Sequence, residues 1–145
     1  MFPELKYPPF NIRLKENGAD KLLVFDVIRK KWIQLTPEEW VRQHVVNYFI
    51  TQQKYPASLI SLEKEIELNG IKKRYDVVVY TNELKPFIIV ECKAPGVELS
   101  QEVLEQASRY NLILKVDYVF ITNGIKDQLY KGGVITTNLP GFDEF

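Results

Sequence analysis

Apolar and polar positions alternate with two different periods along the chain. The segment after Thr36 carries an apolar stripe with helical spacing. The stripe consists of Trp40, Val41, His44, Val45, Tyr48 and Phe49. Thr36 is a good N-cap, Pro37 suits the first helical position, and Glu39 completes a capping-box pattern. The sequence therefore predicts a helix that begins after Thr36 and ends before Pro56.

A strand pattern follows the helix. Apolar and charged residues alternate over residues 59–68, and Asn69-Gly70 is a strong hairpin signal. The return strand covers residues 71–80, and a second turn lies within residues 81–86. Residues 87–93 are apolar on both faces, which is typical of a central strand. These segments predict a three-stranded antiparallel meander.

The rest of the chain completes a mixed sheet. Ser100 can cap a second helix that runs to about residue 115, and residues 117–122 form another apolar strand. The connection through this helix is long enough for a parallel, right-handed crossover. One or two short strands are expected within residues 128–137. The predicted fold class is α/β, a central mixed sheet in αβββαβ order with a helix on each face.

The N-terminal residues are expected to add an arm and a hairpin to a single domain of residues 1–145. Residues 1–20 are rich in proline and polar residues and read as an extended arm. The β-rich runs 22–28 and 32–35 suggest a small hairpin.

Composition excludes several classes of protein. The 145 residues contain 19 Lys and Arg against 19 Asp and Glu, so the chain is not a polycation. Its single cysteine, Cys92, allows no internal disulfide and no Cys-rich zinc site. We see no signal peptide and no membrane-spanning run, so a cytoplasmic protein without a membrane partner is expected.

The predicted registers bring several charges together. The second turn places Asp76 opposite Glu91, and the Asn69-Gly70 turn places Glu63 opposite Asp76, with Lys93 on the same face. Like charges opposite one another destabilise a sheet, so Lys93, a raised pKa or a bound cation should compensate them. Mg²⁺ and Mn²⁺ select such carboxylate oxygens. A solvated rim of charges is the plainer alternative.

These residue types support phosphodiester chemistry. Carboxylates can hold Mg²⁺ against a phosphodiester, and the ammonium of Lys93 can orient water or stabilise developing charge.

Asp76 followed by Glu91-Cys92-Lys93 resembles the Asp…Glu-x-Lys signature of the PD-(D/E)XK nuclease superfamily, whose restriction-endonuclease-like core has the same αβββαβ order. Four segments narrow the resemblance to the N-terminal nuclease domain of type I restriction enzyme R subunits, in small single-domain bacterial versions. The segments are Thr36–Gln43, Arg74–Asp76, Glu91–Pro95 and Gln106–Tyr110. The resemblance covers roughly residues 20 to 140.

The resemblance implies roles for individual residues. Asp76 and Glu91 would bind the metal, and Lys93 would be the catalytic lysine. Gln106 and Tyr110 match a Gln-x-x-x-Tyr motif that helps to position the DNA or the lysine. The remaining match is Glu39, which corresponds to an acidic residue that the first helix points at the metal.

Plainer roles stay open for three of the candidates. Glu39 is explained by helix capping alone, Gln106 by a hydrogen-bonded core amide, and Glu63, a further candidate metal ligand, by an ordinary surface position. Tyr75 also replaces the proline of the Pro-Asp pair.

We therefore expect a Mg²⁺-dependent DNA endonuclease domain in which Mn²⁺ can substitute. Its expected partners are double-stranded DNA, other restriction-modification subunits and a second copy of itself. The chain has no visible motor or specificity domain, on which cleavage depends in the resembled enzymes. The alternatives are a catalytically silent nuclease-fold module that binds DNA or protein, and a repair or junction nuclease of the same superfamily.

Overall fold

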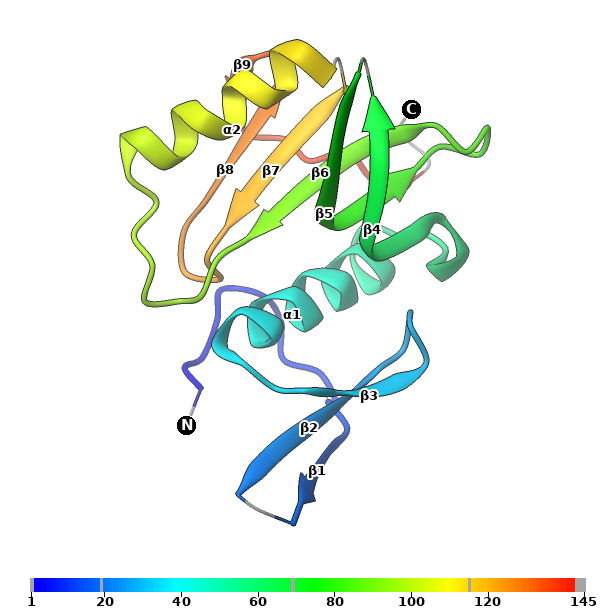
Figure 1. Cartoon of the computed structure of the whole chain (residues 1–145), viewed down its shortest axis with the longest axis vertical. Helices are drawn as coiled ribbons and strands as arrows, with labels where there is room; N and C mark the ends of the chain where they lie inside the picture. Colours follow the sequence, from blue (N-terminus) through cyan, green and yellow to red (C-terminus); the bar gives the residue numbers. More distant parts are fainter. Residues whose placement is uncertain (1, 19, 69, 115, 143–145) are drawn as a thin grey trace.

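The computed structural model describes residues 2–18, 20–68, 70–114 and 116–142 of the chain (Figure 1). A short 3-10 turn, Ala57–Leu59, leads into β4. Within these residues, no helix is both long enough and apolar enough to cross a membrane. The helices and strands are β1 (Leu14–Asn17), β2 (Lys21–Asp26), β3 (Lys31–Gln34), α1 (Pro37–Thr51), β4 (Ile60–Leu68), β5 (Ile71–Tyr80), β6 (Pro86–Cys92), α2 (Gln101–Leu114), β7 (Tyr118–Thr122), β8 (Asp127–Lys131) and β9 (Val134–Thr136).

The larger sheet has the strand order β4-β5-β6-β7-β8-β9. β6 and β7 are parallel and are connected through α2, whereas the other neighbouring strands are antiparallel. The predicted mixed α/β sheet in αβββαβ order is therefore confirmed, with β6 as an inner strand and β8 and β9 at the end of the sheet.

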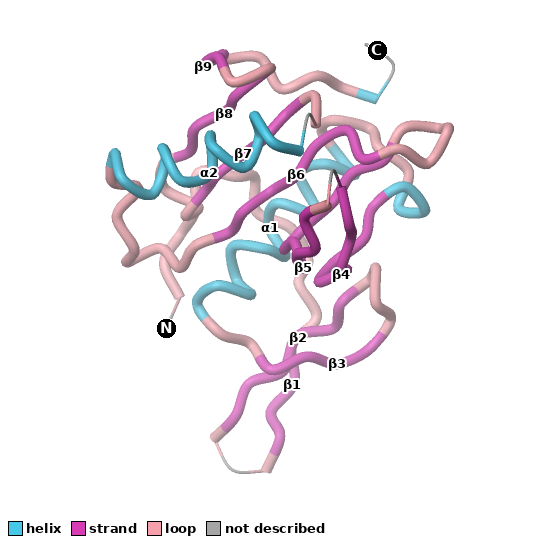
Figure 2. Tube along the Cα trace, turned by 45° about the horizontal axis from the view of Figure 1, so that its top comes forward, coloured by secondary structure: helices cyan, strands magenta, loops and turns pink. Residues whose placement is uncertain are grey.

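The two helices cover opposite faces of this sheet (Figure 2). Val45 of α1 is fully buried in the cluster that contains Val90 of β6. On the other face, Ala107 of α2 packs against Ile121 of β7. Each fully buried aliphatic side chain contributes roughly 1.5–3 kcal/mol, so apolar burial on both faces holds the helices against the sheet.

The start of α1 is capped by Thr36 as predicted, but the capping box is not completed among the described residues, because the Glu39 carboxylate accepts from Arg29, Arg42 and Gln43. Thr36 Oγ1 accepts a hydrogen bond from the backbone N–H of Glu39 at 3.1 Å, and Pro37 occupies the first turn. The cap fixes the first turn of the helix, and this turn carries Glu38 and Glu39 toward β4 and β5.

A second, three-stranded sheet, β1-β2-β3, lies beyond α1 from the large sheet (Figure 1). Its β2–β3 hairpin was predicted, whereas β1 forms within the segment expected to be an extended arm. The beginning of that arm packs on the large sheet, where Leu5 and Tyr7 are buried and the Tyr7 hydroxyl donates to Thr122 Oγ1 at 2.8 Å.

The registers of the meander largely follow the prediction. Glu65 pairs with Arg74, as the Asn69-Gly70 turn predicts, although Asn69 itself lies outside the described residues. Val78 pairs with Ile89 in the predicted β5–β6 register. The prediction is wrong at Tyr80, which pairs with Pro86 because the register shifts after Val79.

Candidate functional site

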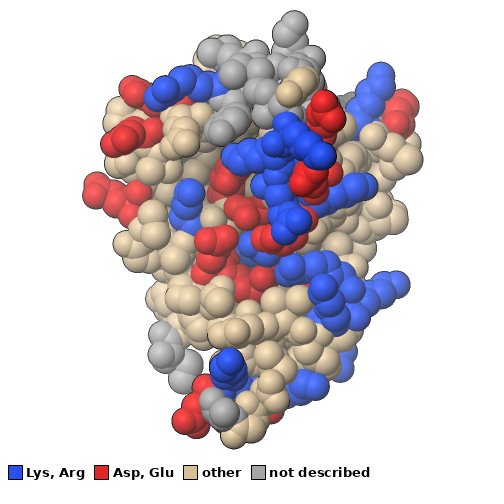
Figure 3. Space-filling view, in the orientation of Figure 1, with Lys and Arg blue, Asp and Glu red and all other residues tan. Residues whose placement is uncertain are grey.

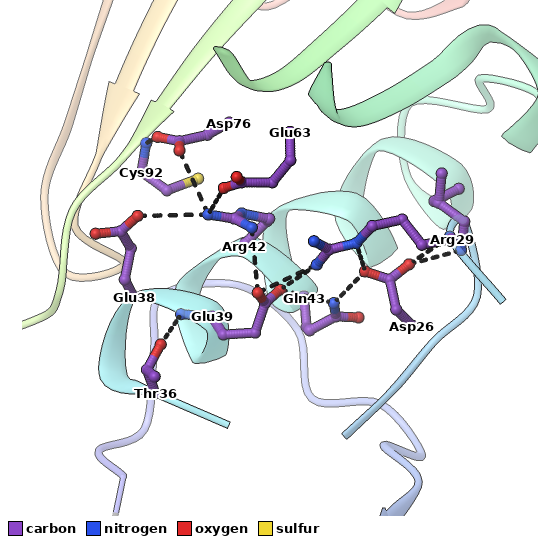
Figure 4. Close-up of polar contacts among 11 residues, drawn as sticks. Asp26, Arg29, Thr36, Glu38, Glu39, Arg42, Gln43, Glu63, Asp76 and Cys92 are labelled. Carbon is purple, nitrogen blue, oxygen red and sulfur yellow. Dashed lines mark hydrogen bonds and ion pairs between the residues drawn. The ribbon is translucent and has the colours of Figure 1, made fainter. Parts of the chain in front are cut away.

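Acidic side chains gather between α1 and strands β4 and β5, around the guanidinium of Arg42 (Figures 3 and 4). Arg42 Nη1 lies 3.1 Å from Glu39 Oε1, and Nη2 lies 2.8 Å from Glu63 Oε1. Nη2 also lies 3.3 Å from Asp76 Oδ1 and 3.4 Å from Glu38 Oε1. The Arg42 side chain is only 5% exposed, so four carboxylates share one buried cation.

A second set of contacts connects this cluster to the β2–β3 turn. Arg29 Nη2 lies 3.1 Å from Glu39 Oε1, and Arg29 Nε lies 2.8 Å from Asp26 Oδ2. Gln43 Nε2 donates to Asp26 Oδ2 at 3.0 Å and to Glu39 Oε2 at 2.9 Å. We refer to these connected side chains as the Arg42 network: Asp26, Arg29, Glu38, Glu39, Arg42, Gln43, Glu63 and Asp76.

An irregularity in the sheet turns Asp76 and Glu63 toward Arg42. The β4–β5 ladder pairs Leu62 with Val77 and Lys64 with Tyr75, and it omits the Glu63–Asp76 pair between them. Glu63 has a φ of 56°, a left-handed conformation that costs a non-glycine residue about 1–2 kcal/mol. Its 2.8 Å ion pair with Arg42 helps to offset this strain.

The Asp76 carboxylate also contacts the backbone of β6. Asp76 Oδ2 accepts a hydrogen bond from the backbone N–H of Cys92 at 2.7 Å. Burial raises the pKa of Asp76 from 3.8 to about 6. The Cys92 hydrogen bond and Arg42 oppose this rise, whereas repulsion from Glu91 and Glu38 adds to it. Asp76 therefore carries its negative charge at an energetic cost.

We expect Asp76→Asn to raise the free energy of unfolding at pH 7.5 by about 1–2 kcal/mol, since one pKa unit corresponds to about 1.4 kcal/mol and the lost Arg42 contact subtracts from the gain. The folded pKa is raised, so the folded state binds the proton more tightly than the unfolded state. The stability of the wild type should therefore fall as the pH rises from about 4 to about 6.

Urea denaturation of both proteins at pH 7.5 and pH 4 measures this effect. The two proteins should differ much less at pH 4, where Asp76 is largely protonated. A lower stability of Asp76→Asn at pH 7.5 would contradict the assigned cost of the Asp76 charge.

Glu91 and Lys93 lie beside a cavity on the α2 side of the sheet. Glu91 Oε1 is 2.8 Å from Lys73 Nζ. The cavity has a volume of about 110 Å³, enough for a few water molecules at about 30 Å³ each. No ion pair holds the Lys93 ammonium among the residues that the structure describes. The lining residues are Lys73, Tyr75, Ile89, Glu91, Lys93, Val103, Gln106, Ala107, Val119 and Ile121.

The two central carboxylates therefore meet different cations. Asp76 contacts Arg42 of α1, whereas Glu91 contacts Lys73 of β5. Glu91 nevertheless contributes to the raised pKa of Asp76, so the two carboxylates interact across the adjacent strands. Of the compensations expected from the sequence, the raised pKa of Asp76 is present. Among the described residues, the cations paired with the two carboxylates are Arg42 and Lys73, where the sequence had suggested Lys93.

Two further candidates lie on α2. Gln106 is exposed and lines the cavity, so it is not a buried core amide. The backbone of Tyr110 belongs to α2, but its side chain lies outside the described part of the structure.

Glu39 and Glu63 have roles in the structure that sequence reasoning did not assign. The amide of Glu39 is capped by Thr36, while its carboxylate accepts hydrogen bonds from Arg29, Arg42 and Gln43. Glu63 binds Arg42 directly. Both carboxylates already contact Arg42. Metal binding by Glu39 or Glu63 stays a prediction.

Sequence reasoning missed the importance of Arg42 and Lys73. Neither residue is among the candidate site residues that the sequence indicated. One signal was available for Arg42, since the helical spacing of Glu38, Glu39 and Arg42 allows ion pairs between them. No comparable local signal indicates the Lys73–Glu91 pair, which depends on the arrangement of β5 and β6.

The donor chemistry of the site fits Mg²⁺ or Mn²⁺. Asp76 and Glu91 supply carboxylate oxygens from adjacent strands, and Asp76 bears its charge in a partly buried place. No group of three His, Cys, Asp or Glu side chains suited to a metal occurs among the described residues. Mg²⁺ requires no such cage, since it is usually held by one or two carboxylates with water and phosphate oxygens.

A mixed α/β domain that brings two strand carboxylates and a lysine to one end of its inner strands has the layout of a nuclease-like domain. Residues 37–139 match the family described as type I restriction enzyme R protein N terminus (HSDR_N). The match covers most of the chain, so the chain belongs to this family. No curated protein matches the sequence.

Among solved structures, the chain is similar to a fragment assigned to an HsdR subunit of a type I restriction enzyme from Vibrio vulnificus YJ016. The identity is 20% and the TM-score is 0.47. The similarity covers 71% of this chain but only 24% of the other, so the chain spans about a quarter of that protein's length.

Proposed function

We propose that the chain is a Mg²⁺-dependent DNA endonuclease domain of the type I restriction R kind, with a PD-(D/E)XK site formed by Asp76, Glu91 and Lys93. The observation that carries the proposal is the pair of interacting carboxylates on β5 and β6, next to a lysine without an ion pair among the described residues. Membership of the R protein N-terminal family supports the same reaction.

Asp76 and Glu91 would hold the metal in this reaction. Bound Mg²⁺ would act as a Lewis acid toward a phosphodiester oxygen and lower the pKa of a bound water. The protein's own contribution is to hold two carboxylates close together. Arg42 and Lys73 make this possible, because each forms an ion pair with one of the carboxylates.

Lys93 would act on the reacting groups. Its side chain lines the cavity beside Glu91, where an ammonium can orient a water or stabilise charge on the phosphate. Gln106 lines the same cavity from α2 and can position the water or the DNA backbone through its amide. Tyr110 keeps its proposed positioning role from the family motif.

Double-stranded DNA is the proposed substrate, and other restriction-modification subunits are proposed partners. A pair of copies could cut both strands of the duplex.

The ion pairs of Asp76 and Glu91 favour one alternative, a silent nuclease-fold module in which Arg42 and Lys73 permanently replace a metal. Isothermal titration of the full chain with Mn²⁺ and Mg²⁺ at pH 7.5 separates the two functions.

We expect wild-type protein to bind Mn²⁺ at millimolar concentrations or below, and Glu91→Gln to bind at least about tenfold more weakly. Glu83→Gln, in the exposed β5–β6 turn, is the matched control and should bind as wild type does. Absence of binding by the wild type, with and without DNA, would favour the silent module.

A further inference from the structure

The small sheet β1-β2-β3 has one face that packs inward and one that is open. On the inward face, Val24 and Asp26 are fully buried, and Asp26 accepts a hydrogen bond from Gln43 of α1. Lys15 pairs with Leu23 and Phe25 pairs with Trp32, so these residues share the other face. Strand alternation places these residues on the outer face: Arg13, Lys15, Lys21, Leu23, Phe25, Trp32 and Gln34.

Two cations on this outer face are held over aromatic rings. The guanidinium carbon of Arg13 lies 4.4 Å from the centre of the Phe25 ring and 5.5 Å from that of Trp32. Lys15 Nζ lies 4.3 Å from the centre of the Trp32 ring. The two rings are themselves in edge contact at 5.4 Å. These cation–π contacts hold the Arg13 and Lys15 side chains over the rings, so the face presents positive charge at defined positions.

The outer face carries positive charge that the described residues do not neutralise. Arg13, Lys15 and Lys21 are exposed, and the described strand positions of this face include no Asp or Glu. No ion pair involves these three cations in the described part of the chain. Arg29, on the adjoining β2–β3 turn, is by contrast paired with Asp26 and Glu39. The unpaired charges complement an extended polyanion.

The basic sheet adjoins the candidate site. Arg29 links the β2–β3 turn directly to Glu39 of the Arg42 network, with an N–O distance of 3.1 Å. Figure 3 shows acidic side chains between α1 and the β4–β5 hairpin, with basic side chains over the hairpin and over the β2–β3 region. A chain of phosphates bound at the acidic site can therefore extend onto the basic regions next to it.

We propose that the outer face of β1-β2-β3 binds the sugar-phosphate backbone of duplex DNA through Arg13 and Lys15. This inference rests on the proposed function, and it adds a contact surface outside residues 37–139, which carry the family match. The rings of Phe25 and Trp32 are already covered by cations, whereas proteins that hold single strands stack bases on open rings. Backbone contacts are independent of sequence, so the surface would position DNA without specifying it.

Fluorescence anisotropy with a labelled duplex of about 30 base pairs tests this surface, in buffer with EDTA so that metal-dependent cleavage does not occur. We expect the double variant Arg13→Glu/Lys15→Glu to weaken binding at least about tenfold. The slope of log affinity against log salt concentration should become shallower by the amount expected for about two lost phosphate contacts. The neutral variant Arg13→Met/Lys15→Met keeps apolar cover on the rings and should show a smaller loss in the same direction.

The control Lys85→Glu/Lys131→Glu makes the same charge change far from the small sheet, at the β5–β6 turn and the end of β8 (Figure 1). Lys131 lies 5.6 Å from the Tyr118 ring, so the control also disturbs a cation–π contact. Equal losses in both double variants, no loss in Arg13→Glu/Lys15→Glu, or no duplex binding by the wild type would overturn the inference. Binding of Mn²⁺ or Mg²⁺ at the candidate site does not depend on the small sheet, so the metal titration tests the proposed function separately.

Discussion

Arg42→Met is expected to lower the free energy of unfolding at pH 7.5 by about 3–5 kcal/mol, the usual cost of removing one partner from a buried ion pair. The Arg42 guanidinium is 5% exposed and contacts Glu38, Glu39, Glu63 and Asp76. Without it, Glu63 and Asp76 would lose their basic partner. Burial alone would lower the pKa of Arg42, but Glu39 and Asp76 raise it overall, so the guanidinium is firmly held in its charged form.

Chemical denaturation of the wild type and Arg42→Met measures the loss. Lys72→Met is the matched control, because the Lys72–Glu65 pair is exposed and should change stability by less than about 1 kcal/mol. Arg42→Lys should recover only part of the loss, since an ammonium lacks the planar fork that reaches several carboxylates. An Arg42→Met protein as stable as the wild type at pH 7.5 would contradict the claim that Arg42 stabilises the carboxylates around it.

Lys93→Ala is expected to reduce the rate of DNA cleavage about 10²–10³-fold, the usual cost of removing a group that stabilises charge in the transition state. Its effect on stability should be small, because no ion pair fixes the ammonium among the described residues. Metal affinity should be kept or increased, since the substitution removes a positive charge beside Glu91.

The cleavage rates of Lys93→Ala and of the control Lys85→Ala, measured on the same plasmid with Mn²⁺, decide the assignment. Lys85 is exposed in the β5–β6 turn, away from the cavity, and its removal should leave the rate unchanged. Cleavage by Lys93→Ala at the wild-type rate would contradict the catalytic role proposed for Lys93.

Local signals in the sequence predicted most of the fold. The Thr36 cap, the Asn69-Gly70 turn and the Ser100 cap each act over a few residues, so the helices and the hairpin follow from nearby residues. β1 was not recognised, because its sequence Leu14–Asn17 is mostly polar and gains its strand partner only in the folded sheet.

The candidate site could be predicted only in part. Regular registers predicted Asp76, Glu91 and Lys93 on one face of the sheet. The structure keeps Asp76 and Glu91 on adjacent strands with interacting charges, but the shared face is wrong, because Asp76 contacts Arg42 of α1 whereas Glu91 and Lys93 line the cavity on the α2 side. The direction of the Asp76 side chain could not be predicted, because it depends on the left-handed backbone at Glu63 and on the Cys92 amide. Arg42 comes from a helix distant in sequence, so its contacts with Glu63 and Asp76 arise only when α1 packs against the sheet.

Incubation of supercoiled plasmid with the full chain is the most direct test of the proposed function. We predict nicked and linear products with wild-type protein in Mg²⁺ or Mn²⁺, no products in EDTA, and no products with Glu91→Gln, which removes a carboxylate charge while keeping its shape. Cleavage that persists unchanged in Glu91→Gln, or in EDTA, would contradict a metal-dependent nuclease site at Asp76 and Glu91.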